Sequence, residues 1–390
     1  MRILHIVDAL TLNGRTMLLQ ELVRHVDPSF KHIILATLKN SGPLTSRFSE
    51  LGINAHAFNL YSPMRGIRNK WKAIRSIIRF RPDVCLCWSG DSNLISVVPR
   101  IFGIPVVWTI HNSTINWNTA AMRCGVRLSA LLSRFVPEKI VCCSYKTYEA
   151  YRNIHNYRQD KLLVITNGVD VRKFRPNKEN REKVRKALEI SCDAIVIATA
   201  ARIELVGRPS QGDFKDLGTL FKAAAIVCQK KPNIIFMLFG VNLTYDNAQL
   251  RGWINEHDLH SNVKLLGLRN DVPELFAASN IYAMSSTTGE GLPISLIEAM
   301  AAGVIPVCTD SGDIGKVIGS AGFVVPQGSA AKLAAAILAI AELSKERRAE
   351  YSRNAVEIVK KFYSIELTTQ RYVDVLAQLV SGKKNDSTSQ

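Results

Sequence analysis

The sequence lacks a long uninterrupted apolar segment. Nowhere in its 390 residues do about 18 apolar residues follow one another without a charge, and Asp8 interrupts the apolar start. We therefore expect neither a transmembrane helix nor a signal peptide. We expect instead a cytoplasmic protein in which residues 3–7 form the first β-strand.

Cysteine and histidine are present, but not in metal-binding patterns. The eight cysteines form no C-x-x-C pair and lie mostly in apolar segments, and the eight histidines show no H-x-x-x-H spacing. Zinc sites usually need such closely spaced ligands. We therefore expect reduced, buried thiols and no bound metal.

Acidic residues are scarce relative to basic ones. The chain has 33 acidic and 50 basic residues, which gives a formal net charge of +17. Such a charge favours a polyanionic partner, which would be a nucleotide, an anionic membrane or a nucleic acid. The sequence has neither zinc-finger spacing nor an RNA-binding strand with aromatic side chains, so we expect no nucleic acid partner.

Two basic segments have the apolar spacing of an amphipathic helix. Residues 65–81 contain seven Lys or Arg residues and no acid, with Trp71 among four isoleucines. Residues 122–135 repeat the pattern with three arginines among leucine and valine. One interpretation is a surface helix whose apolar side packs into the core. The other is a helix on an anionic membrane surface, which would make the protein peripheral on the inner face of the cell membrane.

Apolar strand patterns alternate with helical patterns along most of the chain. Seven strand patterns occur before residue 166, and five more lie between residues 194 and 307. This alternation predicts an α/β fold with two doubly wound, Rossmann-like parallel sheets. Two such sheets facing each other would leave a cleft at the carboxyl ends of their strands, where ligands bind.

The domain boundary is expected in a charged stretch with weak patterning. Residues 170–186 fit this description, so we predict a first domain at residues 1–175 and a second at residues 176–365. The polar tail at residues 383–390 is expected to be disordered.

Two glutamates, Glu290 and Glu298, bracket a loop that leads into a helical pattern. Gly289 and Gly291 free the backbone, and Pro293 suits the first helical turn. A helix N-terminus binds phosphate through its N–H groups and the positive end of its dipole. Carboxylates accept hydrogen bonds from sugar hydroxyls. With Glu298 placed about two turns into the helix, the pattern predicts a sugar-nucleotide site with one glutamate near each sugar.

Two basic residues have places that suit phosphate binding. Arg202 follows the strand pattern 194–201, and Lys215 comes just before the helical pattern 217–229. At a strand end they would hold a diphosphate, whereas each alone would be an ordinary surface charge. Residues 207–212 match the opening of a P-loop, but Asp213 and Phe214 replace its Lys-Ser/Thr pair. We therefore exclude ATP or GTP hydrolysis.

Two further candidates lie where strand patterns end. His111 ends the pattern 106–110 and would either contact a ligand or cap the loop. Gly14 follows the first strand and would either let a ligand approach the backbone or belong to a turn capped by Thr16. A dinucleotide-binding G-x-G-x-x-G motif is absent from the whole sequence.

Together these segments resemble the retaining glycosyltransferases of family 4, which have the GT-B fold. The resemblance spans almost the whole chain, and its most specific part is the E-x7-E pattern of Glu290 and Glu298. Residues 108–112, 166–170, 201–202 and 215–216 match as well. The resemblance implies that Arg202 and Lys215 hold the donor diphosphate and that Glu298 binds the ribose. It implies a catalytic role at the donor sugar for Glu290 and His111.

The resemblance also implies a reaction. A sugar would pass from a nucleotide-diphosphate sugar to a hydroxyl of a glycan or lipid-linked acceptor in capsule, exopolysaccharide or O-antigen synthesis. The helix tip at Gly291 and Leu292 would stabilise the leaving phosphate, so neither metal nor cofactor is expected. Gly14 would line the donor site, and a final helix over residues 366–382 would return to the first domain. A sugar-nucleotide epimerase or hydrolase on the same fold is the alternative.

Overall fold

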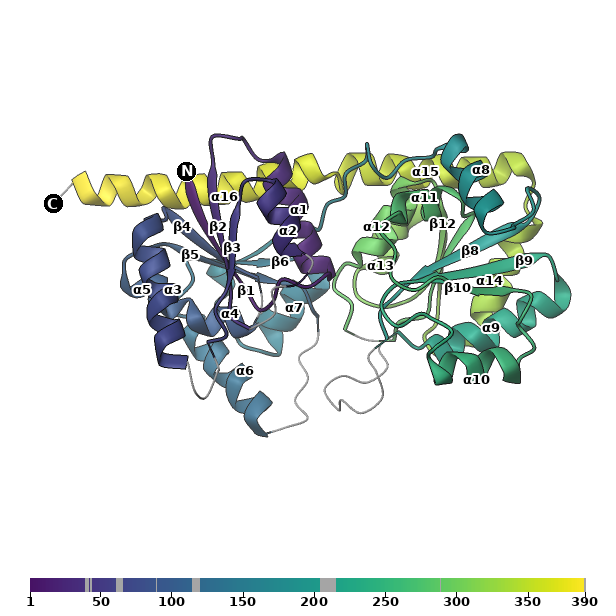
Figure 1. The fold of residues 1–390 in the computed structure, drawn as a ribbon, viewed down its shortest axis with the longest axis horizontal. Coiled ribbons are helices and arrows are strands. Elements are labelled where there is room, and N and C mark those ends of the chain that lie inside the picture. Colours follow the sequence, from purple (N-terminus) through teal and green to yellow (C-terminus); the bar gives the residue numbers. More distant parts are fainter. Residues whose placement is uncertain are drawn as a thin grey trace. The chain divides into compact units, whose positions relative to one another are not determined.

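The computed structural model describes residues 1–38, 42, 44–60, 66–88, 90–113, 120–203, 215–287 and 289–388. The chain divides into two compact units (Figure 1). Unit 1 contains Met1–Gly168 and Ile365–Gln390, and unit 2 contains Val169–Ser364. The chain thus passes from unit 1 to unit 2 after Gly168 rather than after residue 175. Val169 already belongs to unit 2, because it pairs with Ser364 in an isolated parallel bridge.

Unit 1 is built on a seven-stranded parallel sheet with the order β3-β2-β1-β4-β5-β6-β7. The central strands are buried along their whole length, as expected for a parallel sheet that is covered on both faces. Each strand lies within two residues of a strand pattern of the sequence. The strands are β1 (Arg2–Val7), β2 (Lys31–Ala36), β3 (Asn54–Ala57), β4 (Val84–Cys87), β5 (Val106–Ile110), β6 (Lys139–Cys142) and β7 (Leu162–Val164).

Helices connect the strands of unit 1 in the alternating pattern of a doubly wound fold (Figure 1). They are α1 (Gly14–His25), α2 (Leu44–Glu50), α3 (Gly66–Phe80), α4 (Gly90–Ile95), α5 (Val97–Ile101), α6 (Ala120–Leu132), α7 (Tyr145–Asn153) and the short 3-10 helix η1 (Gln159–Lys161).

Unit 2 has a six-stranded parallel sheet with the order β10-β9-β8-β11-β12-β13. Its strands are β8 (Ile195–Ala200), β9 (Ile234–Phe239), β10 (Val263–Leu265), β11 (Ile281–Met284), β12 (Ile305–Thr309) and β13 (Phe323–Val325). Its helices are α8 (Lys178–Ala187), α9 (Leu217–Lys230), α10 (Ala248–Glu256), α11 (Val272–Ala277), α12 (Ile294–Ala301), α13 (Ile314–Ile318), η2 (Gly319–Ala321), α14 (Ala330–Glu342) and α15 (Lys345–Phe362). The predicted α/β fold with two doubly wound parallel sheets is confirmed.

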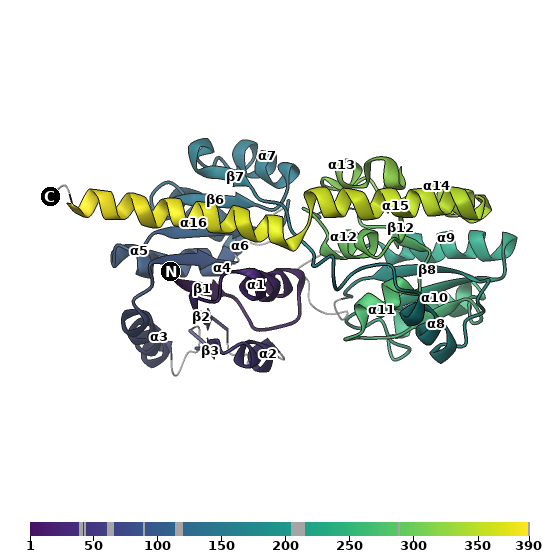
Figure 2. The ribbon, with the colours of Figure 1, turned by 90° about the horizontal axis from the view of Figure 1, so that it is seen from above.

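The last helix, α16 (Ile365–Thr388), belongs to unit 1 and runs along its sheet (Figure 2). Buried side chains recur along one side of it at Ile365, Thr368, Tyr372 and Leu376. Thr368 Oγ1 donates a hydrogen bond of 3.1 Å to the carbonyl of Thr166. The helix extends to Thr388, whereas the sequence predicted a disordered tail from residue 383.

The first basic segment forms α3, and its apolar residues divide between core and solvent. Ala73 and Ile77 are buried, whereas Ile67, Trp71 and Ile78 are exposed. Arg65 lies outside the described residues. The core therefore covers only part of the apolar side of α3. Among the described helices, none combines the length and the hydropathy that crossing a bilayer requires.

Candidate active site

Unit 2 brings two of the predicted residues into contact. Lys215 Nζ and Glu290 Oε1 form an ion pair, although 75 residues separate them in the sequence. Their side chains are 29% and 16% exposed, so water screens this pair less than a fully exposed one. Ser286 Oγ donates a further hydrogen bond of 3.1 Å to the same Oε1.

Strand ends hold the ion pair in place. Ser285 directly follows β11, and its Oγ donates to the backbone carbonyl of Lys215 at 2.8 Å. Thr309 ends β12 and donates its Oγ1 to the carbonyl of Ser286. The pair therefore lies at the carboxyl edge of the unit 2 sheet, where parallel sheets bind ligands.

Asp216, the residue after Lys215, caps the N-terminus of helix α9. Asp216 has a left-handed backbone conformation, with φ at 43°, and its side chain accepts a hydrogen bond of 3.2 Å from the backbone N–H of Thr219. This contact caps the N-terminus of α9. The backbone of Lys215 is thus fixed by Ser285 on one side and by a helix cap on the other.

The loop at Glu290 packs against a glycine. Gly312 has φ at +60°, and a Cβ there would lie 2.3 Å from the carbonyl oxygen of Glu290 and 2.7 Å from that of Gly291. Any other residue would push this loop away. The close approach fixes the backbone of the loop that precedes α12.

Helix α12 starts where the sequence predicted it, but Glu298 lies nearer its beginning. Pro293 is the N-cap residue, Ile294 is the first helical residue and Leu292 is buried. Glu298 is therefore the fifth residue of the helix, just over one turn from its start rather than about two. The shorter separation brings its carboxylate closer to the helix tip than predicted.

Arg202 is exposed just beyond the carboxyl end of β8. Because β8 and β11 are neighbours in the sheet, Arg202 lies at the same edge as Ser285. Residues 204–214 lie outside the described residues, and they include the P-loop-like stretch 207–212 with Asp213 and Phe214. The role of Arg202 in binding phosphate stays a prediction.

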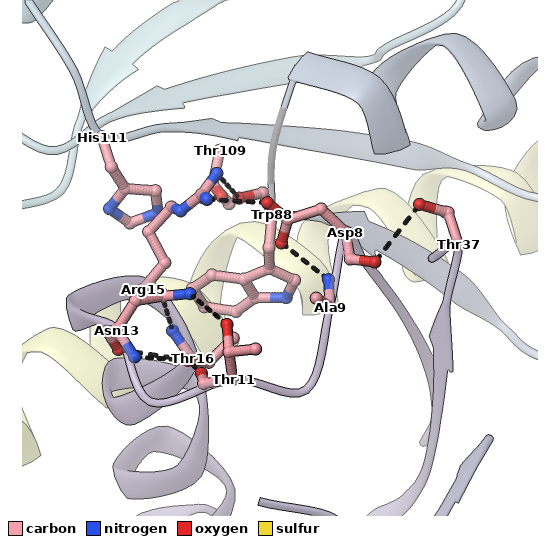
Figure 3. A network of polar contacts seen from close by, with 10 residues as sticks. All are labelled: Asp8, Ala9, Thr11, Asn13, Arg15, Thr16, Thr37, Trp88, Thr109 and His111. Carbon is pink, nitrogen blue, oxygen red and sulfur yellow. Dashed lines mark hydrogen bonds and ion pairs between the residues drawn. The ribbon is translucent and has the colours of Figure 1, made fainter. Parts of the chain in front are cut away.

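In unit 1, His111 directly follows β5 and stacks on an indole ring. The ring centroids of His111 and Trp88 are 5.8 Å apart, and their planes differ by 14° (Figure 3). His111 Nε2 lies 3.1 Å from Thr109 Oγ1. Trp88 directly follows β4, the neighbour of β5, so the stack lies at the carboxyl edge of the unit 1 sheet.

A pair of histidines fixes Trp88. Its indole Nε1 donates to His5 Nδ1 at 3.2 Å, and His5 Nε2 lies 3.0 Å from His32 Nδ1. Because an indole N–H can only donate, the neutral His5 carries its proton on Nε2 and donates it to His32. Burial lowers the pKa of His5, and it lowers the pKa of His32 to about 4. Both rings are therefore neutral at pH 7.

A charged pair borders the stack. Arg15 Nη2 lies 2.8 Å from Asp8 Oδ2, and its Nη1 donates to the carbonyl of Trp88 at 3.3 Å (Figure 3). Burial, followed by the positive charge of Arg15, lowers the pKa of His111 to about 3. At neutral pH the imidazole of His111 is uncharged and offers one hydrogen-bond donor and one acceptor.

Gly14 is the first residue of α1, and Asn13 caps this helix. Asn13 Oδ1 accepts a hydrogen bond of 3.1 Å from Thr16 N, and Asn13 N donates to Thr16 Oγ1 at 3.3 Å (Figure 3). The turn therefore has a reciprocal capping box in which Asn13, rather than Thr16, is the N-cap. Contact of Gly14 with a donor stays a prediction.

The two units offer different chemistry at their carboxyl edges. Unit 2 combines a cation, a carboxylate and two serine hydroxyls, which suits a ligand with both phosphates and hydroxyls. Unit 1 offers an uncharged imidazole on an aromatic ring, which suits hydrogen bonding to a hydroxyl. Ser285, Ser286 and Trp88 were not among the predicted site residues. Each follows an apolar strand pattern, and that position is the signal that could have found them.

Two family models together cover most of the chain. Residues 14–173 match the family described as Glycosyltransferase Family 4, and residues 180–357 match the family described as Glycosyl transferases group 1. The first match falls mainly on unit 1 and the second on unit 2.

Two curated relatives illustrate the similarity of sequence. EpsF of Bacillus subtilis, whose name describes a glycosyltransferase, is 24% identical over 328 residues, which are 80% of this chain and 79% of EpsF. The UDP-Gal:alpha-D-GlcNAc-diphosphoundecaprenol alpha-1,3-galactosyltransferase of Escherichia coli is 21% identical over 280 residues, which are 68% of each chain.

Solved structures share the fold over nearly the whole chain. Anabaena HepE in complex with UDP-glucose has a TM-score of 0.83 at 18% identity and covers 97% of this chain and 99% of its own. WaaG, a glycosyltransferase involved in lipopolysaccharide biosynthesis, has a TM-score of 0.72 at 12% identity. The match covers 96% of this chain and 99% of WaaG.

Proposed function

Because the chain belongs to the glycosyltransferases of group 1 and has the GT-B fold, we propose that it moves a sugar from a nucleotide-diphosphate sugar to a hydroxyl acceptor with retained configuration. The observation that carries this proposal is the partly buried pair of Lys215 and Glu290 at the carboxyl edge of unit 2. A sugar nucleotide carries the two groups that such a pair binds, an anionic phosphate and neutral hydroxyls.

In this proposal the phosphates of the donor contact the basic residues, and its hydroxyls contact the carboxylates. We assign the diphosphate to Lys215 and Arg202, the ribose to Glu298 and the donor sugar to Glu290. The backbone at Gly291 and Leu292 lies at the tip of α12 and faces the leaving phosphate in this assignment. The two cations and the helix dipole supply the positive charge for the leaving group, so we propose catalysis without a metal.

Donor binding requires Lys215 to change partners. In the structure its Nζ contacts Glu290 Oε1, which Ser286 also contacts. A donor phosphate would take over Lys215, and a sugar hydroxyl would take its place on Glu290. The existing pair keeps both side chains in position until then, which reduces the ordering cost of binding.

The reaction itself needs no protein nucleophile. The bond between the anomeric carbon and the leaving phosphate oxygen breaks, and the acceptor oxygen bonds to the same carbon on the same face. The acceptor proton passes to the leaving phosphate. His111 and Gly14 lie on unit 1, and we assign His111 a neutral hydrogen bond to a donor-sugar hydroxyl and Gly14 a backbone contact to the donor.

We further propose that the acceptor is a glycan or a lipid-linked glycan of a polysaccharide pathway. The Escherichia coli relative named above is described as acting on a diphosphoundecaprenol-linked sugar. A net charge of +17 and the exposed Trp71 and Ile67 on the basic helix α3 fit work at an anionic membrane surface.

A thermal-shift screen against UDP-, GDP- and ADP-sugars tests the proposal before any acceptor is known. We expect one nucleotide class to raise the melting temperature of the wild type and to lose this effect in Lys215→Ala. The chosen donor is then incubated without acceptor. Rapid release of free sugar or of an epimer would support the alternative, an epimerase or hydrolase, and would overturn the transferase proposal.

A further inference from the structure

The amino edge of the unit 1 sheet exposes a row of large apolar side chains. Each connection that leads into β4, β5, β6 or β7 carries at least one of them. Ile101 is 76% exposed, Phe135 67% and Ile154 69%, and Ile78 and Phe102 are also exposed. Such residues are common singly on a protein surface, but a row of them marks an interaction site.

Sheet order places these connections side by side. Strands β4, β5, β6 and β7 are consecutive neighbours in a parallel sheet, so the segments before them reach the same edge. It is the edge where β1 begins, which the letter N marks in Figure 1. His111 and Trp88 lie at the other edge, beyond the carboxyl ends of β5 and β4.

The same edge is strongly basic. Residues 79–83, 100–105, 134–139 and 152–161 hold eight Lys or Arg residues and three acids. Two of these acids already pair with arginines, Glu138 with Arg100 and Asp160 with Arg158. The edge therefore offers cations among exposed apolar groups, and an anionic surface complements both.

A hollow of about 540 Å³ opens between α7 and the segment before β6. Three arginines line it, Arg134, Arg152 and Arg158, together with Phe135 and Tyr157. Arginine binds phosphate oxygens through paired N–H groups. Phe135 thus lines a basic hollow and is largely exposed to solvent.

We propose that this amino edge docks unit 1 on an anionic lipid bilayer. Phe135, Ile154 and Ile101 enter the boundary between headgroups and acyl chains, and Arg134 and Arg152 bind lipid phosphates. A lipid headgroup is the occupant that presents a phosphate and an apolar layer within the same few ångströms. The proposal deepens the membrane part of the proposed function, but it does not depend on the sugar-transfer reaction.

Vesicle co-sedimentation of the full chain tests the surface, with phosphatidylcholine vesicles prepared with and without phosphatidylglycerol. We expect the wild type to bind the anionic vesicles and Phe135→Ser/Ile154→Ser to bind them about tenfold more weakly. We expect Arg134→Gln/Arg152→Gln to lose the preference for phosphatidylglycerol. All four positions are exposed, so the variants should fold as the wild type does.

Matched controls lie in unit 2. Leu268→Ser and Phe362→Ser remove side chains of similar exposure, 58% and 48%, and should leave vesicle binding unchanged. Equal binding by Phe135→Ser/Ile154→Ser and the wild type would overturn the proposal. So would binding that only the arginine variant weakens, because a soluble polyanion would then explain the charge without insertion.

A parallel assay separates this proposal from the reaction. Sugar transfer to a soluble acceptor should be unchanged in the two unit 1 variants, because the amino edge lies across the sheet from His111. Vesicle binding needs no donor, so it can be measured even if the donor assignment fails.

Discussion

The carboxyl edges of the two sheets differ in charge. In unit 2, Lys215 and Glu290 keep full charges in contact within a partly buried turn. In unit 1, burial keeps His5, His32 and His111 neutral, and aromatic stacking sets the position of His111. The contrast indicates that unit 2 is suited to a charged diphosphate, whereas unit 1 is suited to uncharged hydroxyls.

Substitutions of the charged pair in unit 2 should have the largest effects on activity. Lys215→Ala and Glu290→Gln should each lower kcat by about 10²–10³-fold, because in the proposed reaction each removes a group that acts directly on developing charge or on the donor sugar. Initial rates at saturating donor measure the effect. Lys222→Ala, an exposed lysine on α9, is the matched control and should keep normal activity. If Lys215→Ala kept a rate within a few-fold of the wild type, the charge at the carboxyl edge of unit 2 would not be needed for the reaction.

The neutral histidines of unit 1 should make stability fall in acid. The unfolded chain protonates them near their ordinary pKa of about 6.5, whereas the folded chain keeps His32 neutral to about pH 4 and His111 to about pH 3. Between these values the unfolded state binds more protons, so the free energy of unfolding drops as pH falls below 6.5, by about 3 kcal/mol or less for His32. Urea titrations at pH 7 and pH 4.5 measure it. Equal midpoints would show that burial does not keep these rings neutral.

The stacked rings should act as one element. We expect His111→Ala to lower kcat/KM by about 10–100-fold, because it removes the hydrogen bond to the donor sugar that we propose for His111. Trp88→Leu should cause a similar loss in the wild type but only a few-fold loss in the His111→Ala background. Trp88→Phe keeps a ring beneath His111 and should recover most of the activity. Additive losses in the double variant would mean that Trp88 affects activity by another route.

Glu298→Gln should have the smallest effect of these. Its carboxylate is assigned to the ribose, away from the bond that breaks, so KM for the donor should rise about tenfold with little change in kcat. Titrating the donor over a wide concentration range separates the two constants. A large fall in kcat with unchanged KM would move Glu298 from donor binding to catalysis.

Local sequence patterns were sufficient for the fold and for placing three candidate residues beside the ends of strands or before a helix. All strands except β13 coincide with an apolar pattern, and Glu290, His111 and Arg202 were each placed at a strand end or a loop before a helix. Strand β13 is no shorter than β7 or β10, and only one of its three residues is buried, and Gly322 before it allows close contact with Pro306. Short edge strands of this kind depend on tertiary contacts.

Partnerships between distant residues could not be read from the sequence. Lys215 meets Glu290 only because β8, β11 and β12 end at one edge, and Trp88 meets His111 only because β4 pairs with β5. The tautomer of His5 depends on the register of β1 with β2 and β4, which brings His32 and Trp88 to its two ring nitrogens. Sheet order supplies this information, and the linear pattern does not contain it.

The bridge between Val169 and Ser364 has a topological consequence. Unit 2 is a continuous insertion into unit 1, and its first and last residues pair in a β-bridge, in which Val169 N donates to the carbonyl of Tyr363 at 2.9 Å. The two chain ends of the insertion are therefore about one strand spacing apart, roughly 5 Å. A segment with adjacent ends can be excised or exchanged as a cassette, which would graft unit 2 of a related enzyme onto this unit 1.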